Sequence, residues 1–286
     1  MSKINIVAEV GCNHQGNVES AFELIRAAAD CGCDVVKFQK RENRLLLTPS
    51  QYKAPHPVPE NSFGTTYGEH RERLEFTAST HRILMAFCEE VGIQYSCSVW
   101  DTQSAMEIKK LNPQHIKIPS ACNLKTDIIN ELAKDWDGVL HVSMGMINYA
   151  ARDWLMKVAF SRIDFKSVVF YHCTSGYPIE YKDAYLLEIG VIRDILTGAI
   201  TTEDYVGYSG HHLGTDLDLV AVGAGATWIE RHFTLDKKAK GTDHSASLDY
   251  AEMKELVEKI RSIEDALEYK RGIPEVEEEQ IKKLRG

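Results

Sequence analysis

The 286-residue chain carries 33 basic and 42 acidic side chains, with a formal net charge of −9 and a pI of about 5.7. This acidic balance, without a basic stripe, argues against nucleic acid as the main partner. No apolar run approaches the ~20 residues that a membrane helix needs, and residues 1–5 lead straight into a predicted strand without a signal sequence. Seven cysteines without a CxxC pair suit reduced thiols. We therefore expect a cytoplasmic protein with neither a membrane nor a nucleic-acid partner.

Short runs rich in β-branched residues alternate with amphipathic stretches along the chain. Strands are predicted at 4–10, 35–39, 94–99, 115–120, 139–144, 168–173, 205–210 and 228–233. Helices are predicted at 18–31, 77–91, 101–111, 124–134, 147–160, 183–197, 215–226 and 250–268. This strict alternation predicts an α/β fold, the (β/α)8 TIM barrel. An open doubly wound sheet is the alternative, but no GxGxxG motif follows the first strand.

Two segments depart from the alternation. Residues 41–76 form a proline-containing insertion after the second strand, which is either a solvated loop or a lid over the mouth of the barrel. As a lid it would point some of its polar side chains inward, and the candidates are Asn61, Thr65, Tyr67, His70 and Arg71. Residues 273–286 form a charged tail, which leaves 1–272 as the barrel domain.

The alternation of side chains along a strand predicts which residues face the barrel axis. Every predicted strand carries polar residues on its inward parity: Glu9, Lys37, Gln39, Ser96, Ser98, Lys117, His141, Ser143, His172, Thr174, Ser209, His211, Glu230 and His232. On the sixth strand this assignment places Val169 and Tyr171 on the outside. Polar side chains gathered at the C-terminal ends of barrel strands are typical of a catalytic mouth.

Two of these residues, His211 and His232, close the last two strands and lie 21 residues apart. Parallel strands would place both imidazoles at the same end of the barrel, where one divalent metal could bridge them, with Asp243 and His244 following in the chain. Imidazole and carboxylate donors suit manganese, iron or zinc better than magnesium.

The inward lysines, Lys37 and Lys117, require either a carboxylate partner, such as Glu9 or Glu230, or an anionic ligand. Hydroxyl groups at strand ends could surround a phosphate, and they belong to Ser98, Ser120, Ser143, Ser175 and Ser209. A Schiff base on either lysine is a competing interpretation.

Several segments in chain order resemble the sialic acid synthase (N-acetylneuraminate synthase) family, whose members condense phosphoenolpyruvate with a sugar aldehyde. These segments are residues 8–16 (AEVGCNHQG), 36–39 (VKFQ), 117–120 (KIPS), 172–178 (HCTSGYP), 207–209 (GYS) with His211, and 229–235 (IERHFTL) with Gly241 and Asp243. The resemblance covers about residues 4–250 and implies the TIM-barrel fold.

Residue by residue, the resemblance implies three groups of site residues. His211 and His232 would bind the metal. The phosphoenolpyruvate site would be lined by Lys37, Ser98, Lys117, Ser120, Ser175 and Ser209. The sugar would face Glu9, Gln39, Tyr177 and Asp243.

The family usually continues into a C-terminal antifreeze-like domain, which holds the N-acetyl end of the sugar across a dimer, and this sequence stops before it. We therefore expect either that the insertion takes over sugar binding through Asn61, Tyr67 and Arg71, or that the substrate is a different aldose.

The expected activity is a transferase reaction of carbohydrate biosynthesis. It would join phosphoenolpyruvate to N-acetylmannosamine or a related aldose, giving a nonulosonic or similar 3-deoxy-2-ulosonic acid and phosphate. Mn²⁺ is the expected metal, with Mg²⁺, Fe²⁺, Co²⁺ or Zn²⁺ as alternatives, and a homo-oligomer is expected. The competing hypotheses are a metal-free Schiff-base aldolase or lyase on the same barrel and a degenerate sugar-binding relative.

Overall fold

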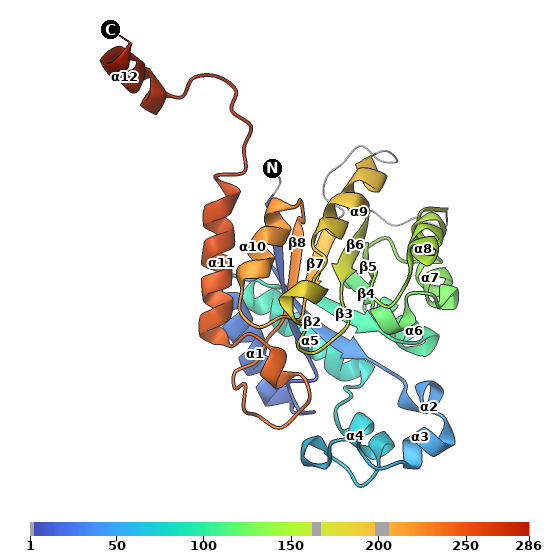
Figure 1. Cartoon of the computed structure of the whole chain (residues 1–286). Coiled ribbons are helices and arrows are strands. Elements are labelled where there is room, and N and C mark those ends of the chain that lie inside the picture. The colour runs from blue at the N-terminus through green and yellow to red at the C-terminus, as the bar shows by residue number, and fades with distance from the viewer. Residues whose placement is uncertain (1–2, 162–166, 198–205, 286) are drawn as a thin grey trace.

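The computed structural model of the protein describes residues 3–161, 167–197 and 206–285. Within these ranges eight parallel strands follow one another around a closed barrel, and the last strand pairs with the first (Figure 1). The strands are β1 (Asn5–Gly11), β2 (Val35–Lys40), β3 (Gln94–Val99), β4 (His115–Ile118), β5 (Val139–Ser143), β6 (Ser167–Cys173), β7 (Val206–Gly210) and β8 (Trp228–His232). The predicted (β/α)8 barrel is thus confirmed, and only residue 205 of the predicted strands lies outside the described residues.

Helices join consecutive strands and cover the outside of the barrel. Those between or after strands are α1 (Val18–Asp30), α5 (Ala78–Val91), α6 (Thr102–Lys109), α7 (Thr126–Leu132), α8 (Tyr149–Ser161), α9 (Leu187–Thr197), α10 (Asp216–Gly223) and α11 (Tyr250–Glu264). Short 3₁₀ turns occupy Pro59–Asn61, Ser120–Cys122, Tyr181–Asp183 and His244–Ala246. Each helix buries an apolar stripe against the strands: in α1 the side chain of Asn17 caps the first turn, and Ala21, Leu24 and Ile25 are buried.

The interior of the barrel is apolar near its base. Side chains from four strands form a buried cluster there: Val7, Val35, Val169, Tyr171 and Trp228. His115 and His141 lie beside it, with His115 Nδ1 and His141 Nε2 3.0 Å apart. Of the polar inward residues expected from the sequence, His141 therefore lies in this lower layer, where it also contacts the ring of Trp228.

The orientation predicted for β6 is wrong. Val169 and Tyr171 point into the barrel, where the Tyr171 hydroxyl lies 3.0 Å from His141 Nδ1. His172 points outward instead and bonds the carbonyl of Ala184 at 2.7 Å. The hydroxyl of Thr174 likewise turns away and donates to the carbonyl of Asp183. The prediction assigned polar residues to the inside of β6, and polarity is not sufficient to decide this. A buried tyrosine can hydrogen-bond through its hydroxyl inside a barrel, and a histidine can hydrogen-bond through its ring nitrogen outside it.

The insertion after β2 folds into short helices rather than an irregular loop. They are α2 (Asn43–Leu46), α3 (Pro49–Lys53) and α4 (Tyr67–Arg73). Capping boxes begin both α3, at Thr48, and α4, at Thr66. Gly68 has no room for a side chain, because a Cβ there would lie 2.4 Å from the ring of Tyr52. The insertion lies at the end of the barrel where β2 ends, so it is placed beside the mouth (Figure 1).

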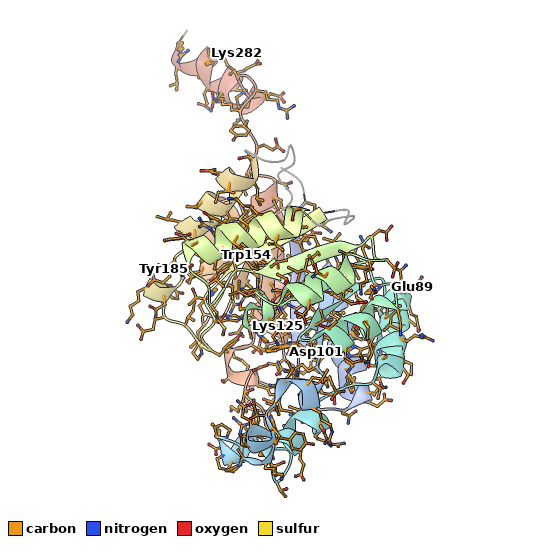
Figure 2. The ribbon with its side chains drawn as sticks, turned by 90° about the vertical axis from the view of Figure 1, so that its right-hand side faces the viewer. Glu89, Asp101, Lys125, Trp154, Tyr185 and Lys282 are labelled. Atoms are coloured by element: carbon orange, nitrogen blue, oxygen red, sulfur yellow. The ribbon has the colours of Figure 1, made fainter. Side chains whose placement is uncertain are left out.

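The charged tail forms a separate helix, α12 (Glu275–Leu284), whose side chains are almost all exposed. It lies beyond the opposite end of the barrel from the insertion, and Lys282 marks its position in the second view (Figures 1 and 2). Among the helices of the described ranges, none combines the length and the apolar character needed to cross a membrane.

A pair of glycine substitutions tests the packing of the barrel base. A Cβ on Gly207 would lie 2.5 Å from the ring of the fully buried Tyr171, whereas a Cβ on Gly190 in α9 would meet nothing within 4 Å. We expect Gly207→Ala to lower the free energy of unfolding by about 1–3 kcal/mol through overpacking. The matched change Gly190→Ala should be neutral or stabilise by about 0.5–1 kcal/mol. Denaturant unfolding of both variants checks this, and equal stabilities would contradict the inward position of Tyr171.

Candidate active site

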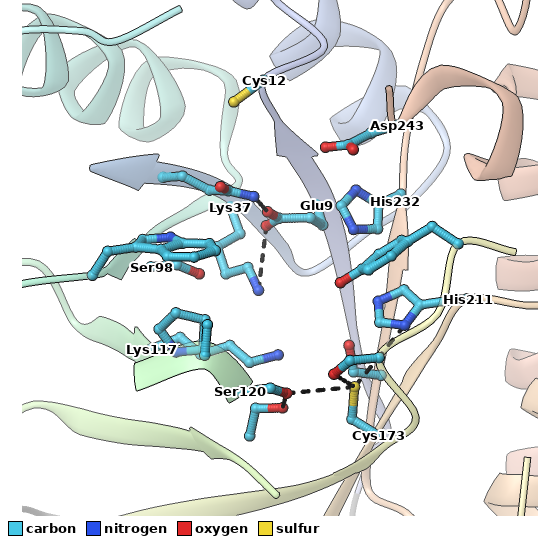
Figure 3. A pocket seen from close by; sticks show the side chains of 18 of the residues that line it. Glu9, Cys12, Lys37, Ser98, Lys117, Ser120, Cys173, His211, His232 and Asp243 are labelled. Atoms are coloured by element: carbon cyan, nitrogen blue, oxygen red, sulfur yellow. Dashed lines mark hydrogen bonds and ion pairs between the residues drawn. The ribbon is translucent and has the colours of Figure 1, made fainter. Parts of the chain in front are cut away.

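A cavity of about 250 Å³ opens at the C-terminal end of the barrel strands (Figure 3). It brings together residues from every strand or the loop that follows it, together with part of the insertion. The predicted site residues that line it are Glu9, Lys37, Gln39, Arg71, Ser98, Lys117, Ser120, Ser143, Ser175, Tyr177, Ser209, His211, His232 and Asp243. Lys37, Lys117, Ser98 and Ser120 lie on one side of the cavity, and His211 and His232 lie on the other (Figure 3).

One buried carboxylate joins the two lysines. Glu230 lies 2.5 Å from Lys37 Nζ and 2.7 Å from Lys117 Nζ, and it also accepts a hydrogen bond from the Ser209 hydroxyl at 3.0 Å. Lys37 reaches a second carboxylate, that of Glu9, at 3.2 Å. The internal ion pairs considered for the lysines therefore exist, and a buried ammonium group needs such partners to remain charged.

Burial and these charges shift the pKa values of the network in different directions. Burial lowers the pKa of Lys117 to about 8, although Glu230 opposes this shift. Burial also opposes protonation of Lys37, but Glu230 and Glu9 outweigh it and raise the pKa of Lys37. For Glu230, the two lysines outweigh burial and hold the pKa of the carboxyl well below its usual range.

The pKa of Glu9 shifts in the opposite direction from that of Glu230, because at Glu9 the effect of burial outweighs that of the nearby lysines. Burial raises the pKa of Glu9 to about 7, despite the opposing charge of Lys37. Gln39 donates a hydrogen bond of 2.7 Å to its Oε1 and fixes the orientation of the carboxyl group. A carboxyl group with a pKa near neutrality can both give and accept a proton, which is the property required of a general acid or base.

The serine hydroxyls come from β3 to β7 and the loops that follow these strands. Ser120 Oγ and Ser143 Oγ are 2.7 Å apart, and Ser175 Oγ lies 3.8 Å from the thiol of Cys173. Ser98 is the register partner of Lys117 on the neighbouring strand. Hydroxyl donors beside two ammonium groups form an environment suited to an anion with several oxygens.

His211 and His232 face each other with ring centroids 5.5 Å apart. His211 Nδ1 lies 2.9 Å from the carbonyl of Thr174, to which it can donate, and this leaves its Nε2 as an acceptor. His232 Nδ1 is buried and has no hydrogen-bond partner in the described part of the chain. Burial lowers the pKa of His232 to about 4, so its ring is neutral, the form that binds a metal.

These two imidazoles fit the expected divalent metal as donors. In the described ranges no group of three or more histidine, cysteine, aspartate or glutamate side chains is arranged to hold a metal ion. Two histidines are one protein ligand fewer than the three of a typical catalytic zinc site, so the remaining coordination positions would be left to water or substrate.

Tyr177 and Asp243 stand at the entrance beside the histidines. The ring of Tyr177, half of whose surface is exposed, lies 4.1 Å from that of His211 and 5.8 Å from that of His232, measured between centroids. The charge of Asp243 acts on His232 in the direction that favours its protonated form. Both residues are placed to contact a ligand bound over the imidazoles.

The insertion supplies part of the cavity wall, but not through all of the residues expected. His70, Arg71 and Leu74, from α4 and its end, line the cavity, whereas Asn61 and Tyr67 do not. Tyr67 lies one layer behind, with its ring stacked on His70 and under the guanidinium of Arg71.

Three further cavity residues were not singled out from the sequence. Arg41 and Trp100 directly follow the last residues of β2 and β3, and Cys173 ends β6. Arg41 and Trp100 could have been predicted, because residues immediately after barrel strands commonly line the active site. Cys173 was missed because the orientation predicted for β6 placed His172 and Thr174 inside the barrel and therefore Cys173 outside it.

Comparisons with known proteins agree with this geometry. The NeuB family matches residues 24–272. N-acetylneuraminate-9-phosphate synthase from Homo sapiens is 35% identical over 262 residues, which cover 92% of this chain and 70% of the relative. N,N'-diacetyllegionaminic acid synthase from Legionella pneumophila is 34% identical over 266 residues, covering 92% and 72%.

A solved structure shows the same fold. The N-acetylneuraminic acid synthetase from Leptospira borgpetersenii, crystallised with citrate, superposes with a TM-score of 0.82 at 24% identity and covers 100% of this chain and 92% of its own. The match to the family and the two relatives cover most of the chain. The chain therefore belongs to the NeuB family and is a synthase of the sialic acid type.

Proposed function

We propose that the protein catalyses a metal-dependent condensation of phosphoenolpyruvate with a sugar aldehyde of the N-acetylmannosamine kind. The products would be a 3-deoxy-2-ulosonic acid of the sialic acid type and inorganic phosphate. The observation that carries the proposal is the pair of buried lysines that share Glu230 opposite the facing imidazoles of His211 and His232.

The reaction forms a carbon–carbon bond and a bond from C2 to the oxygen of water, and it breaks the bond between C2 and the phosphate oxygen. The π electrons of phosphoenolpyruvate attack the aldehyde carbon, and the aldehyde oxygen takes a proton. Water then adds to the electron-poor C2 and loses one proton. The resulting tetrahedral centre expels phosphate, which takes the remaining hydroxyl proton, and a ketone is left at C2. Glu9, with its pKa of about 7, is the residue proposed to give the first proton, because its carboxyl group lines the cavity in a partly protonated state.

The lysine side of the cavity is proposed to bind phosphoenolpyruvate. Lys37 and Lys117 would pair with its carboxylate and phosphate, with hydroxyl groups from Ser98, Ser120 and Ser209 completing the contacts. Charges fixed before the substrate arrives stabilise the charge that develops in the transition state without reorganisation.

The other wall is proposed to hold the sugar aldehyde. Gln39, Tyr177 and Asp243 line the cavity and would contact its hydroxyl groups. A metal, proposed to be Mn²⁺, would be held by His211 and His232 and would polarise the aldehyde carbonyl. Release of phosphate from phosphoenolpyruvate, measured against a panel of aldoses with and without a chelator, tests the proposal as a whole.

The metal assignment can be tested at the two imidazoles. We expect His211→Ala and His232→Ala each to lose bound metal and to abolish turnover, because each removes one of two donors. The control is His172→Ala, which removes a histidine of the neighbouring strand that faces away from the cavity. Metal analysis of purified protein is the measurement, and full occupancy in both active-site variants would refute the assignment.

The phosphoenolpyruvate subsite can be tested at Lys117. We expect Lys117→Met to raise the KM for phosphoenolpyruvate about 10- to 100-fold, since a charge-assisted contact is worth roughly 1.5–3 kcal/mol, and to change the KM for the sugar far less. Lys109→Met serves as control, because Lys109 is also ion-paired, to Glu131 at 2.8 Å, but on α6. An unchanged KM for phosphoenolpyruvate would indicate that Lys117 only forms an internal ion pair with Glu230 and does not bind the substrate. Borohydride trapping of pyruvate on it would indicate a Schiff base instead.

A further inference from the structure

Two buried histidines at the base of the barrel have no part in the proposed reaction. His115 on β4 and His141 on β5 are only 2% and 3% exposed. The interior of such a barrel is usually filled by branched apolar side chains, so an imidazole buried there needs hydrogen-bond partners. The partners of these two histidines lead toward the lysine side of the cavity.

A continuous hydrogen-bond chain runs through both imidazoles. The hydroxyl of Tyr171 lies 3.0 Å from His141 Nδ1. His141 Nε2 lies 3.0 Å from His115 Nδ1, and His115 Nε2 lies 2.7 Å from the side-chain oxygen of Gln94. Gln94 is exposed at the start of β3, so the hydrogen-bond chain connects the buried tyrosine with the surface at the N-terminal end of the strands.

The protons in this hydrogen-bond chain have a single order. Burial lowers the pKa of His115 to about 4 and that of His141 well below its usual range, so both rings are neutral and each carries one N–H group. The oxygen of Gln94 can only accept, so His115 donates from Nε2 and accepts at Nδ1. His141 then donates from Nε2 and accepts at Nδ1 from the hydroxyl of Tyr171. Every donor meets an acceptor, and the hydroxyl end of Tyr171 is fixed in place.

The ring of the same tyrosine contacts a lysine of the cavity. The Nζ atom of Lys117 lies 4.2 Å from the ring centroid of Tyr171. Both side chains are buried, and a cation–π contact is stronger where water is excluded. On the side of β7 the backbone of Gly207 closes on the ring, since a Cβ there would lie 2.5 Å from it. Packing therefore confines one side of the ring, and the hydrogen bond to His141 holds its far end.

Lys117 depends on this contact because its carboxylate partner is shared. Glu230 lies 2.7 Å from Lys117 Nζ and 2.5 Å from Lys37 Nζ. Burial lowers the pKa of Lys117 to about 8, so a small loss of support changes the fraction that is charged near neutral pH. The titratable or charged groups around Lys117 come from five other strands, and they are Glu9, Lys37, His141, Tyr171, Cys173 and Glu230.

We propose that His141 and His115 are positioning residues, whose hydrogen-bond chain holds the ring of Tyr171 against the ammonium group of Lys117. The inference rests on the proposed binding of phosphoenolpyruvate by Lys117. Neither histidine lines the cavity, and neither does Tyr171, so the histidines act on the substrate only through the tyrosine ring and the lysine.

The test removes the histidine and the ring separately and together, in His141→Leu, Tyr171→Leu and the double variant. The pKa of Lys117 is measured by NMR on protein with isotope-labelled lysine, and its signal is assigned by its loss in Lys117→Met. The aromatic face favours the charged form, so each single variant should lower this pKa by roughly 0.5 to 1. Calorimetric binding of phosphoenolpyruvate should weaken about 3- to 10-fold.

The double variant shows whether His141 acts through Tyr171. Once the ring is absent, loss of the histidine should have no further effect, so the double variant should match Tyr171→Leu in both measurements. Should His141→Leu not fold, Tyr171→Phe replaces it, because this change keeps the ring and removes only the hydroxyl that His141 binds. Tyr171→Phe should shift both measurements in the same direction as Tyr171→Leu, by less.

His81→Leu is the matched control. His81 on α5 is fully buried, and its Nδ1 lies 2.7 Å from the hydroxyl of Tyr95 on β3, but neither residue lines the cavity. This variant loses the same kind of histidine–tyrosine hydrogen bond and should leave the pKa of Lys117 and the binding of phosphoenolpyruvate unchanged.

Three outcomes would overturn the inference: an unchanged pKa of Lys117 in folded Tyr171→Leu, additive losses in the double variant, or the same losses in His81→Leu. The NMR measurement separates this inference from the proposed function. If the pKa of Lys117 falls as expected but even the unaltered protein does not bind phosphoenolpyruvate, the positioning of Lys117 is supported and the proposed function is contradicted.

Discussion

The carboxylate of Glu230 holds the centre of the barrel mouth together. Lys37, Lys117 and Ser209 converge on it from three other strands, all within 3.0 Å. Without it, two buried ammonium groups would face each other in a medium that screens poorly, and at least one would lose its proton. Because the four residues come from β2, β4, β7 and β8, the network can form only when the barrel is closed. The charge pattern of the cavity is therefore a consequence of the fold's closure.

The apolar base of the barrel and its charged mouth meet at Tyr171. Its ring packs with Val7, Val35 and Trp228 in the buried cluster, and the Nζ atom of Lys117 lies 4.2 Å from the ring centroid. The aromatic face supports the ammonium group from below while Glu230 binds it directly. The packing of the base thus helps to fix the position of the Lys117 ammonium group along the barrel axis.

The insertion after β2 adds a second source of residues to the mouth. The strands supply the groups needed by a reaction at the centre, whereas α4 contributes His70 and Arg71 at the rim. Its helices are held by capping boxes and by the close approach of Tyr52 to Gly68, so these side chains are presented by an ordered element. A segment outside the barrel alternation can change without disturbing the strands, which makes it a suitable place to determine which sugar is accepted.

The sequence by itself determined the barrel, because the alternation of strand and helix periods is local and each element buries its own apolar face. It also indicated His211 and His232, since the end of a parallel strand fixes where a side chain emerges. Only the tertiary structure decided that Glu230 binds both lysines, that Tyr171 points inward, and that Arg71 forms no ion pair with any of the described residues. These features depend on distances between strands that the order of residues does not encode, and on which buried polar atoms find partners after the barrel has closed.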